Sequence, residues 1–380
     1  MIIKNAKIVL KDKVINGYLE FDNNKIINIC QGKTNKEGYD ANGNYVLPAF
    51  FDSHTHGGYG YDFNMGTESR SLQLNHYLKE VVSEGVASIM MTTVTCSQKD
   101  LKSLADNYLA NKKIDNNNVI KGWYIEGPFI SKDYKGAHNE KLIRKINLAE
   151  LAYISKKLPA VTKLLAIAPD FADNLTKLNK LNKKYHIAIG HTGANYVCAN
   201  KAFDLGCKRV VHLYNAMPDF TKREPTIINA IFNRNDILCE LICDTKHVAK
   251  ETIENTYKIV GANNICIISD SLFTKGLKDG VYDLWNMKVD KKGDLDYLHN
   301  TNKMSGSNLP YHKQVELFGK ITKCSMVDIA KVSSYNAAKY FKIENKIGNI
   351  VKNAQSSFVV LDKNYRLINT FINGRLITKK

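Results

Sequence analysis

Long apolar runs are absent from this sequence. The first ten residues, MIIKNAKIVL, interrupt their apolar positions with Lys4 and Lys7, so they lack the continuous apolar core of a signal peptide. No later stretch is apolar for long enough to span a bilayer. The eight cysteines also lack paired C-x-x-C spacing, and Cys239, Cys243 and Cys266 lie inside apolar stretches. We therefore expect buried, reduced thiols in a cytoplasmic protein with no membrane partner.

Acidic residues are scarce relative to basic ones. The chain has 54 Lys and Arg against 37 Asp and Glu, which gives a formal net charge of +17. Such an excess invites a nucleic-acid or anionic-surface interpretation, because basic charge concentrates anions nearby. The lysines are spread along the chain rather than clustered, however, which is typical of a solvated lysine-rich surface. We therefore expect no nucleic-acid partner, and a small anionic substrate would not be repelled.

The alternation of residue types predicts two kinds of structure. Residues 1–47 and 344–380 read as short strands and turns, which predicts that the two ends pair into one small β-sandwich domain. Residues 48–343 alternate apolar strands with amphipathic helices, as parallel sheets with crossover helices do. Eight strands fit a (β/α)8 TIM-type barrel, and a doubly wound sheet is the alternative. The strand candidates are 46–53, 87–94, 120–126, 163–168, 186–190, 210–214, 238–244 and 265–270.

Polar residues that are able to bind a metal stand at or near the ends of these apolar runs. They are His54, His56, Glu126, His191, His212 and Asp270. Each has a structural reading by itself, as a satisfied core histidine, a helix cap or a turn residue. In a barrel, however, the carboxyl ends of all strands face one mouth, whereas an open sheet would spread the six along a line. Their joint occurrence predicts a metal site in a barrel.

Imidazoles and carboxylates suit a divalent ion such as zinc, with iron as the alternative. Glu126, His191 and His212 would hold one ion, and His54 and His56 with a bridging Glu126 could hold a second; the sequence leaves the number open. Such an ion lowers the pKa of bound water and polarises a carbonyl, while a carboxylate moves the proton to the leaving nitrogen. We assign that catalytic role to Asp270.

Longer motifs carry a resemblance. They are Leu47 to Gly58 (LPAFFDSHTHGG), Tyr124 to Phe129 (YIEGPF), Lys135 to Asn139 (KGAHN), Gly190 to Thr192 (GHT), His212 to Met217 (HLYNAM) and Arg223 to Pro225 (REP). Together they resemble the N-acetylglucosamine-6-phosphate deacetylase family of the amidohydrolase superfamily, nearly from end to end. The resemblance implies hydrolysis of the acetamide of a 6-phosphorylated amino sugar in cytoplasmic amino-sugar breakdown, by a homodimer.

The resemblance also implies roles for single residues. Glu126, His191 and His212 match the family's metal ligands, His54 and His56 match a pair that only some members retain, and Asp270 matches the catalytic base. The matched substrate-binding residues are His138 near the acetamide, Asn215 and Ala216 at the phosphate end, Arg223 and His247 at the phosphate or sugar, and Ser307. Arg223 or His247 would serve the neighbouring subunit. An Arg fork suits phosphate well.

The sequence departs from the family pattern near the substrate. Thr226 follows Arg223-Glu224-Pro225 where Gly is usual, Thr245 and Lys246 precede His247, and serines flank Asp270. Lys246 adds a cation, which fits an altered sugar phosphate such as the galacto epimer. Two other functions stay open: another amidohydrolase acting on a different amide, and a non-catalytic barrel that senses sugar phosphates or binds nucleic acid. Residues 272–309 read as a hairpin lid beside Asp270.

Overall fold

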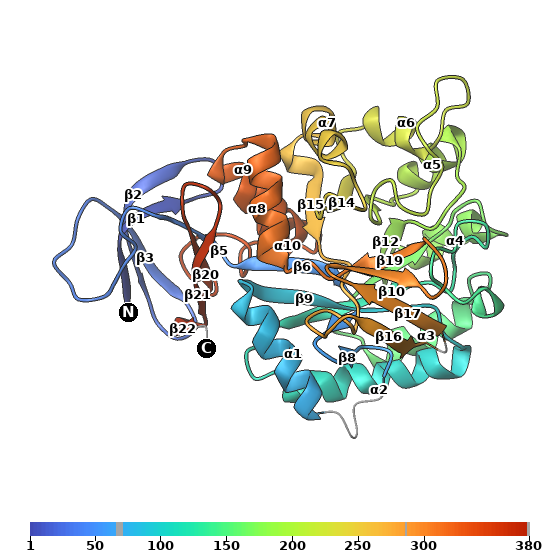
Figure 1. Cartoon of the computed structure of the whole chain (residues 1–380), viewed down its shortest axis with the longest axis horizontal. Coiled ribbons are helices and arrows are strands. Elements are labelled where there is room, and N and C mark those ends of the chain that lie inside the picture. The colour runs from blue at the N-terminus through green and yellow to red at the C-terminus, as the bar shows by residue number, and fades with distance from the viewer. Residues whose placement is uncertain (66–70, 286, 378–380) are drawn as a thin grey trace.

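The structure is a computed structural model that describes residues 1–65, 71–285 and 287–377. Figure 1 shows a small β-rich part, built from both ends of the chain, beside a larger α/β part. Residues 378–380 of the predicted terminal segment and residue 286 of the predicted lid lie outside the described residues. The two chain ends are drawn in blue and red and lie side by side, as the sequence predicts.

The large part is a parallel barrel. Its strands, in spatial order, are β15 (Ile265–Ile268), β14 (Leu238–Ile242), β13 (Arg209–Val210), β12 (His186–Ile189), β11 (Thr162–Ile167), β10 (Ile120–Glu126), β9 (Val86–Thr93) and β6 (Phe50–Thr55). The first and last strands meet, because the backbone N–H of Asp270 donates to the carbonyl of His54 at 3.0 Å and that of His56 to Ser271 at 2.9 Å. This closure confirms the (β/α)8 barrel over the doubly wound sheet.

A helix follows each barrel strand. They are α1 (Ser71–Ser83), α2 (Gln98–Ile114), α3 (Leu148–Lys157), α4 (Asn174–Leu181), α5 (Tyr196–Asp204), α6 (Ile227–Phe232), α7 (Lys250–Val260) and α8 (Tyr311–Thr322). Side-chain oxygens cap several amino ends, as Ser97 does for α2 and Asn195 for α5. Two further helices, α9 (Met326–Ala330) and α10 (Asn336–Tyr340), follow α8, and α10 packs on β6 and β15.

The small part is one eight-stranded sheet from both chain ends. Its strands are β1 (Ile2–Val9), β2 (Val14–Phe21), β3 (Ile26–Gln31), β4 (Tyr39–Asp40), β5 (Tyr45–Pro48), β20 (Phe358–Leu361), β21 (Leu367–Ile372) and β22 (Arg375–Ile377). The rings of Phe21 on β2 and Phe358 on β20 are 5.3 Å apart although two strands separate them in the sheet. In a flat sheet they would be roughly 14 Å apart. The sheet therefore folds onto itself and buries a sandwich-like core.

Two smaller antiparallel sheets lie at the carboxyl ends of the barrel strands. They are the hairpin of β7 (Gly57–Gly58) with β8 (Tyr61–Asp62), and a four-stranded sheet of β16 (Gly280–Leu284), β17 (Met287–Lys292), β18 (Leu295–Leu298) and β19 (Met304–Ser307). We call the four-stranded sheet the flap. The sequence predicts one hairpin in residues 272–309, whereas the structure has a sheet of four strands there.

Two predicted strands differ from the observed ones. The stretch 46–53 divides at Ala49, because β5 pairs with β20 of the small sheet and β6 enters the barrel. Hydrophobicity alone does not mark this break, since both pieces are buried. The predicted strand 210–214 ends at Val210, and His212 has a positive φ of 26° that turns the chain. The predicted domain boundaries at 47/48 and 343/344 stay a prediction.

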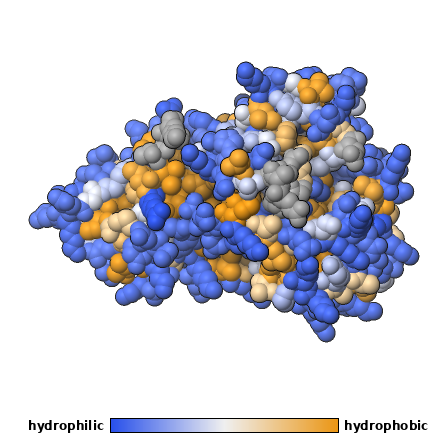
Figure 2. Space-filling view, turned by 90° about the horizontal axis from the view of Figure 1, so that it is seen from below, coloured by the Kyte–Doolittle hydropathy of each residue, from blue (hydrophilic) through white to orange (hydrophobic). Residues whose placement is uncertain are grey.

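The surface is largely hydrophilic and the thiols are unpaired, as the composition and the cysteine spacing predict. Figure 2 shows one face on which hydrophilic residues surround separate apolar patches. All eight cysteines are free thiols, and six of them are buried. Across the described residues, none of the helices combines the length and apolarity needed to cross a membrane.

Candidate metal centre and active site

The barrel brings the six predicted metal-site residues to one mouth. His54 lies near the end of β6 and His56 just beyond it, and Glu126 is the last residue of β10. His191, His212 and Asp270 each stand two residues beyond the ends of β12, β13 and β15. All of these side chains are buried except that of Asp270, which is 15% exposed. Parallel strands bring them together because their carboxyl ends share one edge.

Glu126 stands between two groups of imidazoles. Its Oε1 lies 3.1 Å from His212 Nε2 and 3.3 Å from His191 Nε2. Its Oε2 lies 3.1 Å from His56 Nε2 and 3.5 Å from His54 Nε2. Ligand atoms around a tetrahedral ion at about 2.0–2.1 Å are roughly 3.3 Å apart, so both groups have the spacing that such an ion needs. Each oxygen of one carboxylate thus serves its own ligand group.

The Nδ1 atoms of three of the histidines are hydrogen-bonded, which leaves their Nε2 atoms free to bind a metal. His54 Nδ1 lies 2.7 Å from Oε2 of Glu240, and His191 Nδ1 lies 2.9 Å from the carbonyl oxygen of Tyr134. His212 Nδ1 lies 3.2 Å from the carbonyl oxygen of Asn215. These acceptors place the proton on Nδ1 and the lone pair on Nε2, which is how metal-ligating histidines are held. The residues present therefore fit a divalent ion.

The electrostatics of the cluster also favour a cation. Burial acts to lower the pKa of His54, but the carboxylates of Glu126, Glu240 and Asp270 outweigh it and raise that pKa well above its usual value. Burial acts to raise the pKa of Asp270, yet His54 and His56 hold it well below its usual range. The carboxylates thus keep their negative charge in a buried place, where a positive ion compensates it.

Three of the converging residues have left-handed backbones. The φ angles of His191, His212 and Asp270 are 48°, 26° and 51°. Residues other than glycine seldom adopt such angles, and those that do cluster at functional sites because the surrounding fold holds them there. The turn at each strand end aims the side chain back across the barrel mouth.

A buried ion pair lies beneath the ligands. Glu240 accepts from Arg209 Nε at 2.6 Å, and both side chains are fully buried inside the barrel. Arg209 also donates to the Ser53 hydroxyl and lies over the ring of Tyr340, at 5.3 Å from its centroid. Neither residue was predicted from the sequence as part of the site. Their signal was a charged residue in the middle of an apolar strand, as in Leu238-Cys239-Glu240-Leu241-Ile242.

A cavity of about 380 Å³ opens over the candidate metal ligands. His138 lines it and is fixed by Thr95, whose backbone N–H donates to His138 Nδ1 at 3.2 Å. Because Nδ1 accepts that bond, the ring proton resides on Nε2 and points towards the cavity. Burial and the neighbouring His191 lower the pKa of His138 to about 4, so the ring is neutral. His138 is therefore a neutral donor beside the candidate metal ligands, 3.6 Å from Glu126.

The remaining predicted substrate residues divide into two sets. Asn215, Ala216 and His247 line the cavity, and His247 Nδ1 is held by Asp244 at 2.7 Å. Arg223 and Ser307 are not among the described residues that line it. Arg223 is exposed in the segment between Met217 and α6, and Ser307 is buried behind Asp270, whose carbonyl accepts its backbone N–H at 3.2 Å.

The flap covers one side of the cavity. Trp285, in the turn after β16, donates from Nε1 to Asp62 of β8 at 3.1 Å, and its ring lies 5.8 Å from that of His56. Gly306 of β19 and Lys303, just before this strand, line the cavity. A Cβ on Gly306 would stand 2.9 Å from the carbonyl oxygen of Asp270, so glycine allows β19 to approach the last barrel strand closely. Figure 1 shows the flap strands in front of the barrel near β10.

Two departures from the family pattern have local structural reasons. Thr226 is the N-cap of α6, where its Oγ1 accepts from the Ile228 N–H at 3.3 Å and its own N–H donates to Asn229 at 2.9 Å. Lys246 is exposed and lies outside the described cavity lining. Asp244 caps the turn before it by accepting the N–H groups of Lys246 and His247, both at 2.8 Å.

A closed barrel whose mouth holds a carboxylate between two imidazole groups, with a further Asp at the last strand, has the residue types that a metal-dependent hydrolase needs. The chain belongs to the Amidohydrolase family, whose sequence pattern matches residues 45–377.

Within that family the chain is similar to N-acetylglucosamine-6-phosphate deacetylases. It is 28% identical over 387 residues to the one from Bacillus subtilis (strain 168), covering 99% of this chain and 96% of the relative. It is 29% identical over 391 residues to the one from Lysinibacillus sphaericus, covering 99% and 97%. The crystal structure of the Thermotoga maritima N-acetylglucosamine-6-phosphate deacetylase is 29% identical, with a TM-score of 0.89 and full coverage of both chains.

Proposed function

We propose that this chain hydrolyses the acetamide of N-acetylglucosamine-6-phosphate to glucosamine-6-phosphate and acetate. The observation that carries the proposal is the arrangement around Glu126, with an imidazole group at each carboxylate oxygen and Asp270 beside them. The similarity to deacetylases of this name over nearly the whole chain supports the choice of substrate.

The ligands would be Glu126, His191 and His212 for one ion, and His54, His56 and Glu126 for a second. We propose zinc, with iron as the alternative, because neutral imidazoles and carboxylates suit both. A bound ion lowers the pKa of water towards neutrality and polarises the acetamide carbonyl.

Asp270 moves the proton. Its Oδ1 lies 3.2 Å from His56 Nε2 and 3.4 Å from His54 Nε2, so the carboxylate faces the place where the attacking water would stand. It accepts a proton as the water oxygen bonds to the acetamide carbon. It then gives this proton to the sugar nitrogen as the carbon–nitrogen bond breaks, so that the products are acetate and the free amine.

The rest of the cavity positions the sugar phosphate. His138 donates from Nε2 to a substrate oxygen near the acetamide. Asn215, Ala216, His247 and the cationic Lys303 would bind the sugar and its phosphate from the walls of the cavity. Arg223 and Ser307 would not bind the substrate from the cavity of their own chain, because neither lines it. Ser307 would instead support Asp270 from behind, through the hydrogen bond from its backbone N–H to the Asp270 carbonyl.

We further propose that the chain acts as a cytoplasmic homodimer. Free thiols suit a reducing compartment. Arg223 is exposed on a segment that also exposes 57% of Phe220, so this segment has an apolar and a cationic group to offer to a second copy. Sedimentation of the metal-loaded protein with and without Phe220→Asp tests the dimer; a wild-type monomer would contradict it.

The experiment for the activity is acetate release from N-acetylglucosamine-6-phosphate by the zinc-loaded protein. The comparison substrates are the galacto epimer and both unphosphorylated sugars, and the comparison variant is Asp270→Asn. We expect release from the phosphorylated gluco sugar, and a fall of about 10²–10⁴-fold in the variant. Faster release from the galacto epimer would reassign the sugar. Equal release from unphosphorylated sugars, or none from any of the four, would overturn the proposal.

A further inference from the structure

A second cavity lies at the other end of the barrel. Its volume is about 770 Å³, and it opens at the amino ends of β11, β12 and β13 beside the last residues of α10. We call it the basal pocket. Its basic lining residues are Lys163, Lys183, Lys184, Lys208, Lys342 and His186.

The basal pocket is separate from the metal centre. His186 is the first residue of β12, whereas the metal-ligand candidate His191 stands beyond the other end of the same strand. At roughly 3.3 Å per residue, β12 alone extends for about 10 Å from His186 to Ile189 and so lies between the two sites. No residue lines both cavities among the parts of the chain that the structure describes. A ligand in the basal pocket would therefore leave the active site free.

The charge of the pocket has one sign. Among the described residues that line it there is no Asp or Glu. Lys208 pairs with Asp236 at 2.5 Å, outside the lining. Lys183, Lys184 and Lys342 are exposed and make no salt bridge with a described residue. Positive charge thus converges on one hollow without an internal counter-charge, which raises the local concentration of anions.

Two lining groups, the buried Lys163 and the half-buried His186, experience this unbalanced charge. Lys163 is only 4% exposed and donates from Nζ to the carbonyls of Leu158 and Val161, at 2.6 and 2.8 Å. Burial, followed by the charge of Lys184, lowers its pKa. Burial, followed by Arg209 and Lys342, lowers the pKa of His186 to about 4. An anion in the pocket would relieve the repulsion between Lys163 and the neighbouring Lys184.

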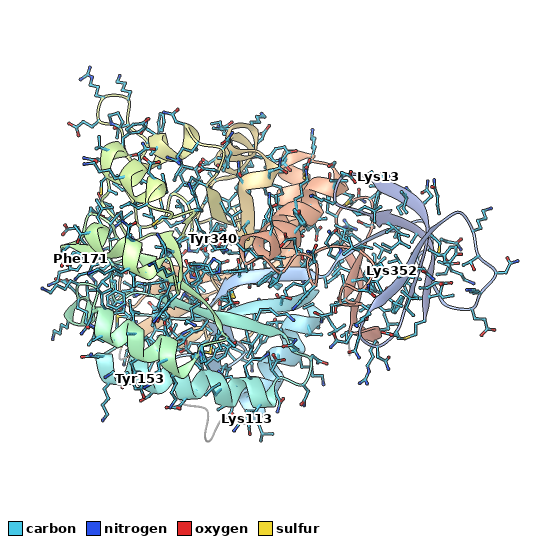
Figure 3. All side chains as sticks on the ribbon, turned by 180° about the vertical axis from the view of Figure 1, so that it is seen from behind. Lys13, Lys113, Tyr153, Phe171, Tyr340 and Lys352 are labelled. Carbon is cyan, nitrogen blue, oxygen red and sulfur yellow. The ribbon has the colours of Figure 1, made fainter. Side chains whose placement is uncertain are left out.

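One wall of the pocket is ordered by contacts that need no ligand. Tyr340 donates from its hydroxyl to the Ile187 carbonyl at 3.2 Å, and its ring lies 5.2 Å from that of His186. Arg209 packs on the far side of this wall, 5.3 Å from the Tyr340 ring. Figure 3 shows Tyr340 within the barrel part and Lys13 on the small β-rich part, in the turn between β1 and β2. Because this wall is already ordered, less conformational entropy would be lost when a ligand binds.

We propose that the basal pocket is a binding site for a small phosphorylated molecule. Its volume lies within the range of about 300–1,000 Å³ that small-molecule sites occupy. Lysine ammonium groups bind phosphate as mobile point charges, and several of them around one hollow suit a group with two or more negative charges. A nucleic acid would need a continuous basic track, whereas these lysines converge on one cavity.

The test uses pyridoxal 5′-phosphate, a phosphate-bearing aldehyde that condenses with a lysine amine and is fixed by borohydride. The metal-loaded protein is labelled, and the modified peptides are quantified by mass spectrometry. We expect Lys183, Lys184 or Lys342 to be labelled about tenfold faster than the exposed Lys13, because the pocket concentrates the reagent. Excess inorganic pyrophosphate should abolish that advantage, whereas sodium chloride at equal ionic strength should not.

Matched variants distinguish a specific anion site in the basal pocket from a general attraction of the reagent to a basic surface. In Lys184→Gln/Lys342→Gln the label on Lys183 should fall to the rate of Lys13, and Lys13→Gln should leave the pocket labels unchanged. All four side chains are exposed, so the melting temperature is expected to stay unchanged and serves as the fold control. Labelling of the three pocket lysines no faster than Lys13, or protection by sodium chloride equal to that by pyrophosphate, would overturn the proposal.

Discussion

Oε2 of Glu240 lies 2.7 Å from His54 Nδ1 and also accepts the backbone N–H of His212 at 3.3 Å. One buried carboxylate on β14 therefore touches a member of each candidate ligand group. Its other oxygen is held by Arg209 at 2.6 Å. Glu240 thus fixes the tautomer of His54 and the turn at His212 while the ion pair with Arg209 stays inside the barrel.

We predict that Glu240→Gln weakens metal binding about 10–100-fold, because such outer contacts orient the ligands. The measurement is metal content by mass spectrometry after dialysis against graded chelator. Glu20→Gln, which alters the surface pair with Lys36, is the matched control and should retain metal. Removing one charge also leaves Arg209 buried without its partner, so Arg209→Met/Glu240→Met is measured as well, since apolar replacement of a whole pair spares folding. Wild-type metal affinity in both variants would contradict the role.

His138→Gln should separate positioning from metal binding. The ring donates from Nε2 into the cavity and is not in either candidate ligand group. We expect kcat/KM to fall about 10²-fold or more, as loss of a single preorganised donor does, while the metal content stays at the wild-type level. Loss of metal together with activity would show that His138 is a ligand rather than a donor.

Trp285→Phe should loosen the flap. The substitution removes the hydrogen bond to Asp62 but keeps a ring beside His56. A hydrogen bond to a charged group contributes about 1.5–3 kcal/mol, so we expect KM for the phosphorylated sugar to rise about tenfold or more. The sequence has two tryptophans, and the other, Trp123, is buried in β10. A change in fluorescence on substrate binding that is absent from Trp285→Phe would assign the flap contact; unchanged KM and fluorescence would refute it.

The free energy of unfolding should fall in mild acid because of His186. Its pKa is lowered to about 4 by burial and by the cations Arg209 and Lys342, and Tyr340 packs on its ring. The unfolded chain therefore binds more protons below a pH of about 6.5, and the stability present above this value is lost as the pH falls towards 4. After allowance for partial exposure, we expect a loss of about 1 kcal/mol between pH 7 and pH 5 from this residue.

The check is urea unfolding of wild type and His186→Phe across that interval in buffer without phosphate. Other histidines titrate equally in both proteins, so the difference between the two curves reports His186. A difference that stays constant with pH would contradict the assignment.

The sequence predicted which residues converge at the barrel mouth where the chain places candidate ligands at strand ends. His54, Glu126 and Asp270 follow apolar runs, and the period of a strand together with the barrel geometry determines which edge they share. His212 was predicted inside a strand, yet it stands beyond β13 with a positive φ. His212 could still be predicted as a candidate ligand, because its residue type and its position near a strand end do not depend on the backbone turn at this residue.

Other features could not be read from local pattern. Val46 and Phe50 lie in one apolar run, but the first belongs to the small sheet and the second to the barrel, since the pairing partners come from residues far along the chain. The flap has four strands because Leu295–Leu298 pairs on both sides, which local alternation does not specify.

By itself, the sequence determined the class of fold, the types of the candidate ligand residues and their order along the chain, because hydrophobic period and side-chain chemistry are local properties. Only the tertiary structure decided that Glu126 faces two imidazole groups, that Glu240 and Arg209 support them from inside the barrel, and that Arg223 is exposed outside the cavity lining of its own chain. These are contacts between residues distant in sequence, and their geometry follows from closure of the barrel and packing rather than from any one segment.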